Sequence, residues 1–82
     1  MKRDLQAELD ARVRRQISEQ DPPEAAAAFD RMVGEGRTPA EARRRMAAAL
    51  LAETHAMVRD ARPFDPAGYA AALAALPRIL KR

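Results

Sequence analysis

Apolar residues recur at steps of three and four along most of the chain, the spacing of one buried helical face. In the first segment Leu5, Leu9, Val13 and Ile17 stand four residues apart, with arginines between them. Together with the start and stop signals described next, this spacing predicts helices near 3–19, 22–34, 39–61 and 66–76. We therefore expect an all-α fold, a small bundle of about four helices, in a single domain spanning 1–82 with a short basic tail at 77–82.

Three of the predicted helices begin with a capping residue followed by proline. Asp21 and Thr38 each stand three residues before a glutamate, which predicts two capping boxes closed by Glu24 and Glu41. Asp65-Pro66 has the cap and the proline without the glutamate. There, Phe64 is placed to pack on Tyr69 as a hydrophobic staple.

Glycine and proline mark the expected helix ends. Gly34 and Gly36 punctuate the end of the second helix, and Arg62-Pro63 ends the third. The third helix is the longest, and we expect it to be central. The methionines at 32, 46 and 57 are expected to fill gaps in the core, although an adaptable contact surface would also use them. We expect the apolar residues Ile79 and Leu80, which follow Pro77, to fold back onto the bundle.

Composition limits the kinds of site and the cellular compartment that we expect for this chain. The chain has 82 residues, no cysteine and a net charge of +3. Disulfides and thiolate metal sites are thereby excluded. The basic start is followed by acids rather than an apolar run, so it does not read as a signal peptide. The longest stretch of low charge, 66–77, is too short to cross a bilayer. We expect a cytoplasmic protein without membrane contact.

Candidate catalytic chemistry centres on His55, the only histidine, with Glu53 nearby in sequence. A general base oriented by a carboxylate is one interpretation, and an exposed structural histidine is the favoured one. A metal site needs about three protein ligands, and the chain has no second histidine and no cysteine. Gly34-Glu35-Gly36 lacks the preceding strand and third glycine of a phosphate loop. We expect no enzyme activity, no cofactor and no metal.

Arginine is the most prominent charged residue and supplies a candidate contact surface. Three consecutive residues on a helix span roughly 200 degrees, so 43–45 cannot form one flat patch. Arginines of the first helix extend the surface if the first and third helices are neighbours. The candidate surface comprises Arg12, Arg15, Arg37, Arg43, Arg44 and Arg45.

The order of several features from about 13 to 76 resembles a family of small bacterial helical domains of uncharacterised function. The matching features are Gln16, Asp21-Pro22-Pro23-Glu24, Arg31-Met32, Gly36, Glu41-Ala42, and Arg62-Pro63-Phe64-Asp65 followed by Tyr69, Leu73 and Leu76. The family pattern often carries histidines where this chain has Asp10, Ala40 and Arg44. The resemblance implies that a polar or metal site of the relatives is lost here, and that Asp10 and Arg44 pair between the first and third helices.

Two functions remain open. The first is a non-enzymatic helical module for protein–protein interaction or self-association, because a chain this small buries a thin core and gains stability from a second copy. The alternative is a nucleic-acid-binding accessory protein that uses the arginines of the first and third helices. A net charge of +3 is small for that role.

Overall fold

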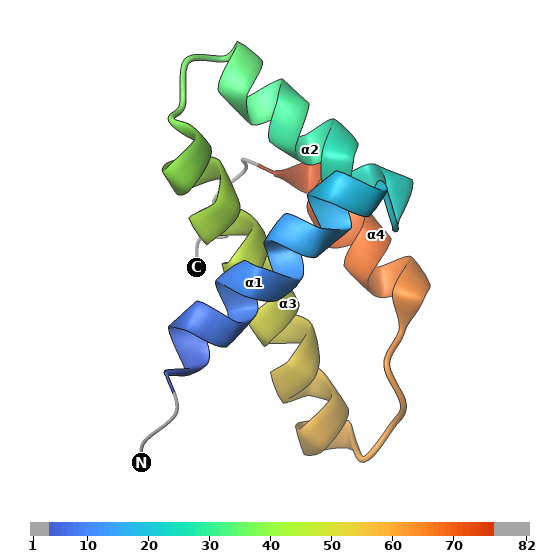
Figure 1. Ribbon diagram of the computed structural model, residues 1–82. Helices are drawn as coiled ribbons and strands as arrows, with labels where there is room; N and C mark the ends of the chain where they lie inside the picture. The colour runs from blue at the N-terminus through green and yellow to red at the C-terminus, as the bar shows by residue number, and fades with distance from the viewer. Residues whose placement is uncertain (1–3, 77–82) are drawn as a thin grey trace.

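The computed structural model describes residues 4–76, which form four α-helices joined by short loops (Figure 1). They are α1 (Leu5–Glu19), α2 (Pro23–Gly34), α3 (Pro39–Asp60) and α4 (Pro66–Ala75). The predicted all-α fold is confirmed, and each boundary lies within two residues of its expected place. The tail at 77–82, with Ile79 and Leu80, lies outside the described residues.

α3 packs against each of the other three helices, so its predicted central position is confirmed. Figure 1 shows α1 crossing in front of α3 and α4 lying behind them, while α2 contacts all three. α1 and α4 are joined through the core by a hydrogen bond in which the Tyr69 hydroxyl donates to Gln16 Oε1 at 2.7 Å.

The core is built from alanines and a few large side chains. Ala25, Ala28, Ala42 and Ala47 are buried where helices meet, and small side chains let the backbones approach closely while burying little area each. The largest fully buried side chains are Tyr69, Met32, Met46, Leu73 and Val13. Met32 and Met46 are therefore core residues, as expected. Of the apolar stripe on α1, Leu9 and Val13 are buried, whereas Leu5 is 55% exposed.

The predicted cap of α3 is confirmed, and its capping box is only half formed. Thr38 Oγ1 accepts a hydrogen bond from the backbone N–H of Glu41 at 3.1 Å. The Glu41 carboxylate accepts from Arg45 at 3.0 Å, one helical turn onward, rather than from Thr38. α1 is capped by Asp4, whose side chain accepts from the N–H groups of Gln6 and Ala7.

The predicted cap of α2 is wrong. α2 begins at Pro23, its N-cap is Pro22, and no side chain caps it. A residue that precedes proline is disfavoured in the helical region, so Pro22 stays extended, at φ −75° and ψ 156°, and cannot be the first helical residue. Asp21 thus stands one position too early to cap, and its bond to Pro22 is cis.

α4 begins at the predicted place with a different set of contacts. Asp65 is its N-cap, but the Asp65 side chain makes no capping hydrogen bond. The predicted staple is present, since the Phe64 and Tyr69 rings meet edge to face with centroids 5.7 Å apart. α2 ends as predicted, because Gly36 adopts φ +101°, a conformation that favours glycine.

The end of α4 is held by a side chain from another helix. α4 has neither a terminal glycine nor a basic residue in its last turn. Arg31 of α2 supplies the missing donors, because its Nε and Nη2 donate to the Leu76 carbonyl at 3.0 and 2.8 Å, and Nη2 also donates to the Leu73 carbonyl at 2.9 Å. A cation at a helix C-terminus satisfies carbonyls that the helix leaves open and is favoured by the helix dipole.

Candidate functional site

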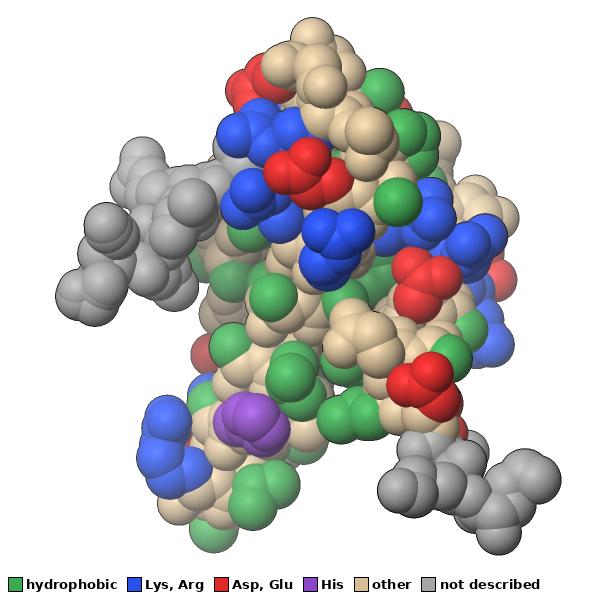
Figure 2. Space-filling view, turned by 90° about the vertical axis from the view of Figure 1, so that its left-hand side faces the viewer, with side chains coloured by type: hydrophobic (Ala, Val, Ile, Leu, Met, Phe, Trp, Pro, Cys, Tyr) green, Lys and Arg blue, Asp and Glu red, His purple; other side chains and the backbone are tan. Residues whose placement is uncertain are grey.

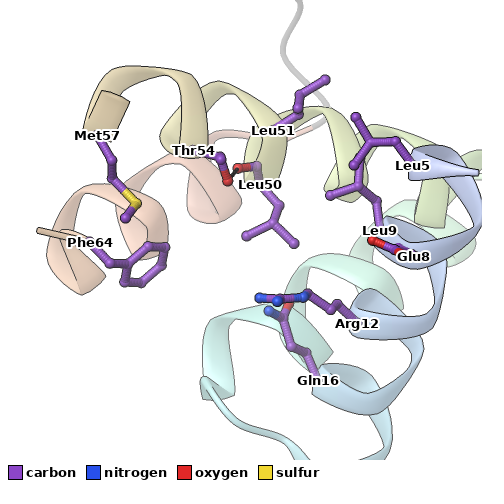
Figure 3. Close-up of a pocket in the computed structure, with 10 residues that line it drawn as sticks. All are labelled: Leu5, Glu8, Leu9, Arg12, Gln16, Leu50, Leu51, Thr54, Met57 and Phe64. Carbon is purple, nitrogen blue, oxygen red and sulfur yellow. Dashed lines mark hydrogen bonds between the residues drawn. The ribbon is translucent and has the colours of Figure 1, made fainter. Parts of the chain in front are cut away.

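An apolar groove of about 570 Å³ opens between α1 and α3, and the loop that follows α3 closes one end of it (Figure 3). Most of its lining is apolar, with polar side chains from α1 and one, Thr54, from α3. The lining residues are Leu5, Glu8, Leu9, Arg12, Gln16, Leu50, Leu51, Thr54, Met57 and Phe64.

Two helical faces and one anchored loop position this lining. On α1 the lining residues follow the same stripe that carries Leu9 into the core, and on α3 they recur at helical spacing from Leu50 to Met57. Figure 1 shows the two helices crossing, and the groove lies between them. Leu50 is only 5% exposed, and Figure 3 shows it pointing into the space between α1 and Phe64.

Glu53 fixes the loop that carries Phe64. Its carboxylate accepts from Arg62 Nη1 at 3.0 Å and from the backbone N–H of Asp65 at 3.1 Å, so it holds residues on both sides of Phe64. The Glu53 side chain is 11% exposed, and hydrogen bonds to a charged acceptor this sheltered contribute more than those of an open surface pair. The position of Phe64 at the rim of the groove is therefore fixed by the hydrogen bonds of Glu53 as well as by the ring contact with Tyr69.

The polar end of the groove is formed by Arg12 and Gln16. Gln16 Oε1 already accepts the Tyr69 hydroxyl inside the core. Burial raises the pKa of that hydroxyl, and the hydrogen bond to Gln16 offsets part of the rise. Arg12 is exposed and makes no ion pair with any residue in 4–76, so it presents a positive charge beside an apolar floor.

Large apolar side chains that stay exposed gather around this groove. Within the described part of the chain they are Leu5, Val58 and Phe64, with exposed fractions of 55%, 79% and 39%. Leu5 and Phe64 line the groove, and Val58 follows the lining residue Met57 directly on α3. Met57, expected to fill a core gap, is only half-buried and also lies here. Figure 2 shows hydrophobic side chains around the single histidine, His55, on this side of the molecule.

The arginines of the candidate contact surface do not form one patch. Arg37 pairs with Glu35 at 2.8 Å, Arg43 with Asp10 at 3.1 Å and Arg45 with Glu41 at 3.0 Å. Among residues 4–76 the other three candidates, Arg12, Arg15 and Arg44, are exposed and make no ion pair. Figure 2 shows acidic side chains among the basic ones, so half of the predicted surface is neutralised by neighbours.

The expected ion pair between Asp10 and Arg44 is wrong, because Asp10 pairs with Arg43 instead. Asp10 binds Arg43 across the α1–α3 contact and Arg14 along α1, at 3.1 and 2.7 Å. Successive helical residues point about 100 degrees apart, so only one of Arg43 and Arg44 can face α1 in this way. The hydrogen bond from Arg14, and after it that from Arg43, holds the pKa of the Asp10 carboxyl below its usual range.

His55 lies on the exposed side of α3, away from the carboxylate named with it in the sequence. Glu53 is turned toward Arg62 and Asp65 and has no hydrogen bond to His55. Within residues 4–76 no three His, Asp or Glu side chains gather closely enough to hold a metal ion. In the same part of the chain no helix has the length and apolarity needed to cross a membrane.

Sequence reasoning missed the groove and the role of Glu53. The periodicity identified the apolar faces of α1 and α3, but it could not show that Leu5 and Met57 would remain uncovered. The one available signal was Leu51 and Val58, which widen the apolar side of α3 beyond what a single core-facing stripe needs.

Comparison of the chain with protein-family models, with curated proteins and with solved structures finds no match. The resemblance to the family of small bacterial helical domains therefore stays a prediction.

Proposed function

We propose that this chain is a non-enzymatic protein–protein interaction module that binds a helix at the groove between α1 and α3. One observation carries the proposal: two of the three exposed large apolar side chains of the described chain, Leu5 and Phe64, line this one groove. Apolar side chains clustered beside a concave surface are typical of a site for an amphipathic helix, which inserts residues spaced three and four apart.

The groove lining includes one acid, Glu8, and one arginine, Arg12. Arg12 stands at the polar end of the groove without an ion pair among residues 4–76, one helical turn beyond Glu8 on α1. A bound helix therefore gains from an acidic residue that lies beside Arg12 rather than beside Glu8. Met57, with its flexible thioether side chain, adapts the rim to different apolar partners.

A synthetic amphipathic peptide with leucines at helical spacing and one glutamate tests this proposal. Titration followed by methyl NMR should shift resonances of Leu9, Leu51 and Met57, whereas a peptide of the same composition with scrambled spacing should not. Arg12→Glu should weaken binding about two- to fivefold, the value of one exposed ion pair, and a lysine in place of the peptide's glutamate should restore it. Shifts confined to another face, or none, would contradict the proposal.

The alternative function, nucleic-acid binding by the arginines, depends on Arg12, Arg15 and Arg44. These three are exposed and make no ion pair among residues 4–76, while Arg37, Arg43 and Arg45 are each paired with an acid. Phosphate contacts release counterions, so this binding would fall steeply with salt. With half of the candidate arginines already neutralised, we rank it second.

A further inference from the structure

The outward side of α3 carries a second regular pattern beside the core-facing one. Its residues are spaced alternately four and three apart, which is the spacing of a coiled-coil contact. We call this row the α3 seam; it consists of Arg44, Ala48, Leu51, His55 and Val58. Ala48, His55 and Val58 are exposed, and Leu51 is half-buried.

The bundle does not account for the seam. The buried residues of α3 are Ala42, Met46, Ala47 and Leu50, which face the other helices, and the seam lies largely on the opposite side. Val58 remains 79% exposed. Leu51 belongs both to the seam and to the groove, and Figure 3 shows it directed toward Leu5 of α1. The seam therefore extends the apolar surface of the groove along α3.

The seam is complementary to itself when two copies of α3 run antiparallel. In an antiparallel pair of this spacing Ala48 comes opposite Val58 of the other copy, and Leu51 comes opposite His55. Small residues thus meet large ones, and the exposed Ala48 and Ala52 leave room for close approach.

The charges along α3 favour the same direction. Its first half, 39–49, has three arginines and one glutamate, and Asp10 of α1 pairs with one of these arginines, which leaves a net charge of +1. Its second half, 50–60, has two acids and one arginine, and Arg62 pairs with the acid Glu53, which leaves no net charge. Antiparallel pairing places the positive half beside the neutral half, whereas parallel pairing places the two positive halves together. Antiparallel helix dipoles add to this preference.

We propose that the partner of this module is a second copy of the same chain, bound through an antiparallel pairing of the two α3 seams. The inference rests on the proposed function and names its partner. If the chain binds the amphipathic peptide but never self-associates, this inference is wrong and the proposed function stands.

Cysteine cross-linking tests the pairing, because the natural chain has no cysteine. Ala48→Cys and Val58→Cys proteins are prepared separately, then mixed, mildly oxidised and separated without reductant. The antiparallel seam brings position 48 beside position 58, so only the mixture should give a covalent dimer as its main product. Alone, each protein should stay unlinked, because equal positions lie about 15 Å apart along the helix axis, beyond the reach of a disulfide.

Other outcomes overturn the inference. Efficient linking of each single variant with itself would indicate parallel pairing, and no linking in any sample would mean that the seams do not meet. Ala27→Cys provides the matched control, because it is an exposed position of α2 outside the seam and its cross-linking reports random collision. Both seam positions are exposed, so the substitutions should leave the fold intact, which circular dichroism of each variant verifies.

Discussion

Thr38 and Asp21 precede helices that begin with similar sequences, but only Thr38 accepts a capping hydrogen bond. Thr38 caps α3 through a 3.1 Å hydrogen bond from Glu41 N–H, while α2 has no side-chain cap at all. We expect Thr38→Ala to lower the free energy of unfolding by about 1 kcal/mol and Asp21→Ala to change it by less than about 0.5 kcal/mol. Urea denaturation measures both. Equal losses at the two positions would contradict the caps described here.

Leu50 is the residue whose packing bears most on the α1–α3 contact. It is 5% exposed, belongs to the core and forms part of the groove floor. Leu50→Ala should cost about 2–4 kcal/mol, because it removes buried methyl groups and leaves a cavity. Val58→Ala, at an exposed position of the same helix, is the matched control and should cost little. An unchanged denaturation midpoint for Leu50→Ala would show that the core has been placed wrongly.

Because of Tyr69, the free energy of unfolding should depend on pH in the alkaline range. Its pKa is raised in the folded state by burial, so ionisation is disfavoured there relative to the unfolded chain, where a tyrosine titrates near about 10. The resulting stability is fully present below that value and is lost as pH rises through the pKa of the folded protein. Tyr69→Phe should flatten the alkaline decline. As Tyr69 is the only tyrosine, its absorbance follows the titration directly; an unshifted titration would contradict the buried environment.

At the scale of elements, Arg31 connects α2 to the end of α4. Four of its hydrogen bonds go to backbone carbonyls of Leu73, Ala74 and Leu76. Arg31→Met keeps much of the side-chain length but loses these bonds, and we expect a loss of about 1–3 kcal/mol. Arg31→Lys should recover only part, since an ammonium cannot reproduce the guanidinium fork. Full rescue by lysine in thermal denaturation would show that charge alone matters.

The helices themselves could be predicted from sequence because their ends are local. Prolines at 23, 39 and 66, the Thr38 cap and the turn at Gly36 act over three or four residues. Asp21 failed as a cap through an equally local effect, the restriction that Pro23 places on Pro22.

The contacts between elements were not predictable in the same way. Arg31 meets Leu76 across 45 positions, and Asp10 meets Arg43 across 33. Side-chain spacing says which face of a helix is apolar, but it does not say which neighbour covers that face. The groove exists because α1 covers only part of α3, and this depends on how the two helices cross.

At the scale of the whole molecule, a small alanine-rich core accompanies an apolar surface that stays open. The buried side chains at helix contacts include four alanines, so close packing is achieved with little buried area per residue. Exposed Leu5, Val58 and Phe64 add apolar surface that a partner would cover. A second copy bound through the α3 seam would bury Val58 and stabilise the fold increasingly as the protein concentration rises.

Val58→Asp should separate association from folding. Val58 is 79% exposed, so a charge there costs the isolated bundle little, whereas in a paired seam it would be buried against Ala48 of the other copy. We expect the variant to keep the helical content of the natural chain and to fail to self-associate. Arg15→Asp, exposed on α1 and outside the seam, controls for the charge change.

The most direct test that α3 presents a protein-binding face is the solution mass over a concentration series, measured by light scattering in low and high salt. We expect the mass to rise from the 9.1 kDa of one chain toward twice that value at both salt concentrations, and to stay at one chain for Val58→Asp. A natural chain that remains monomeric at every concentration, or that carries nucleic acid removed by salt, would contradict the pairing of two α3 seams.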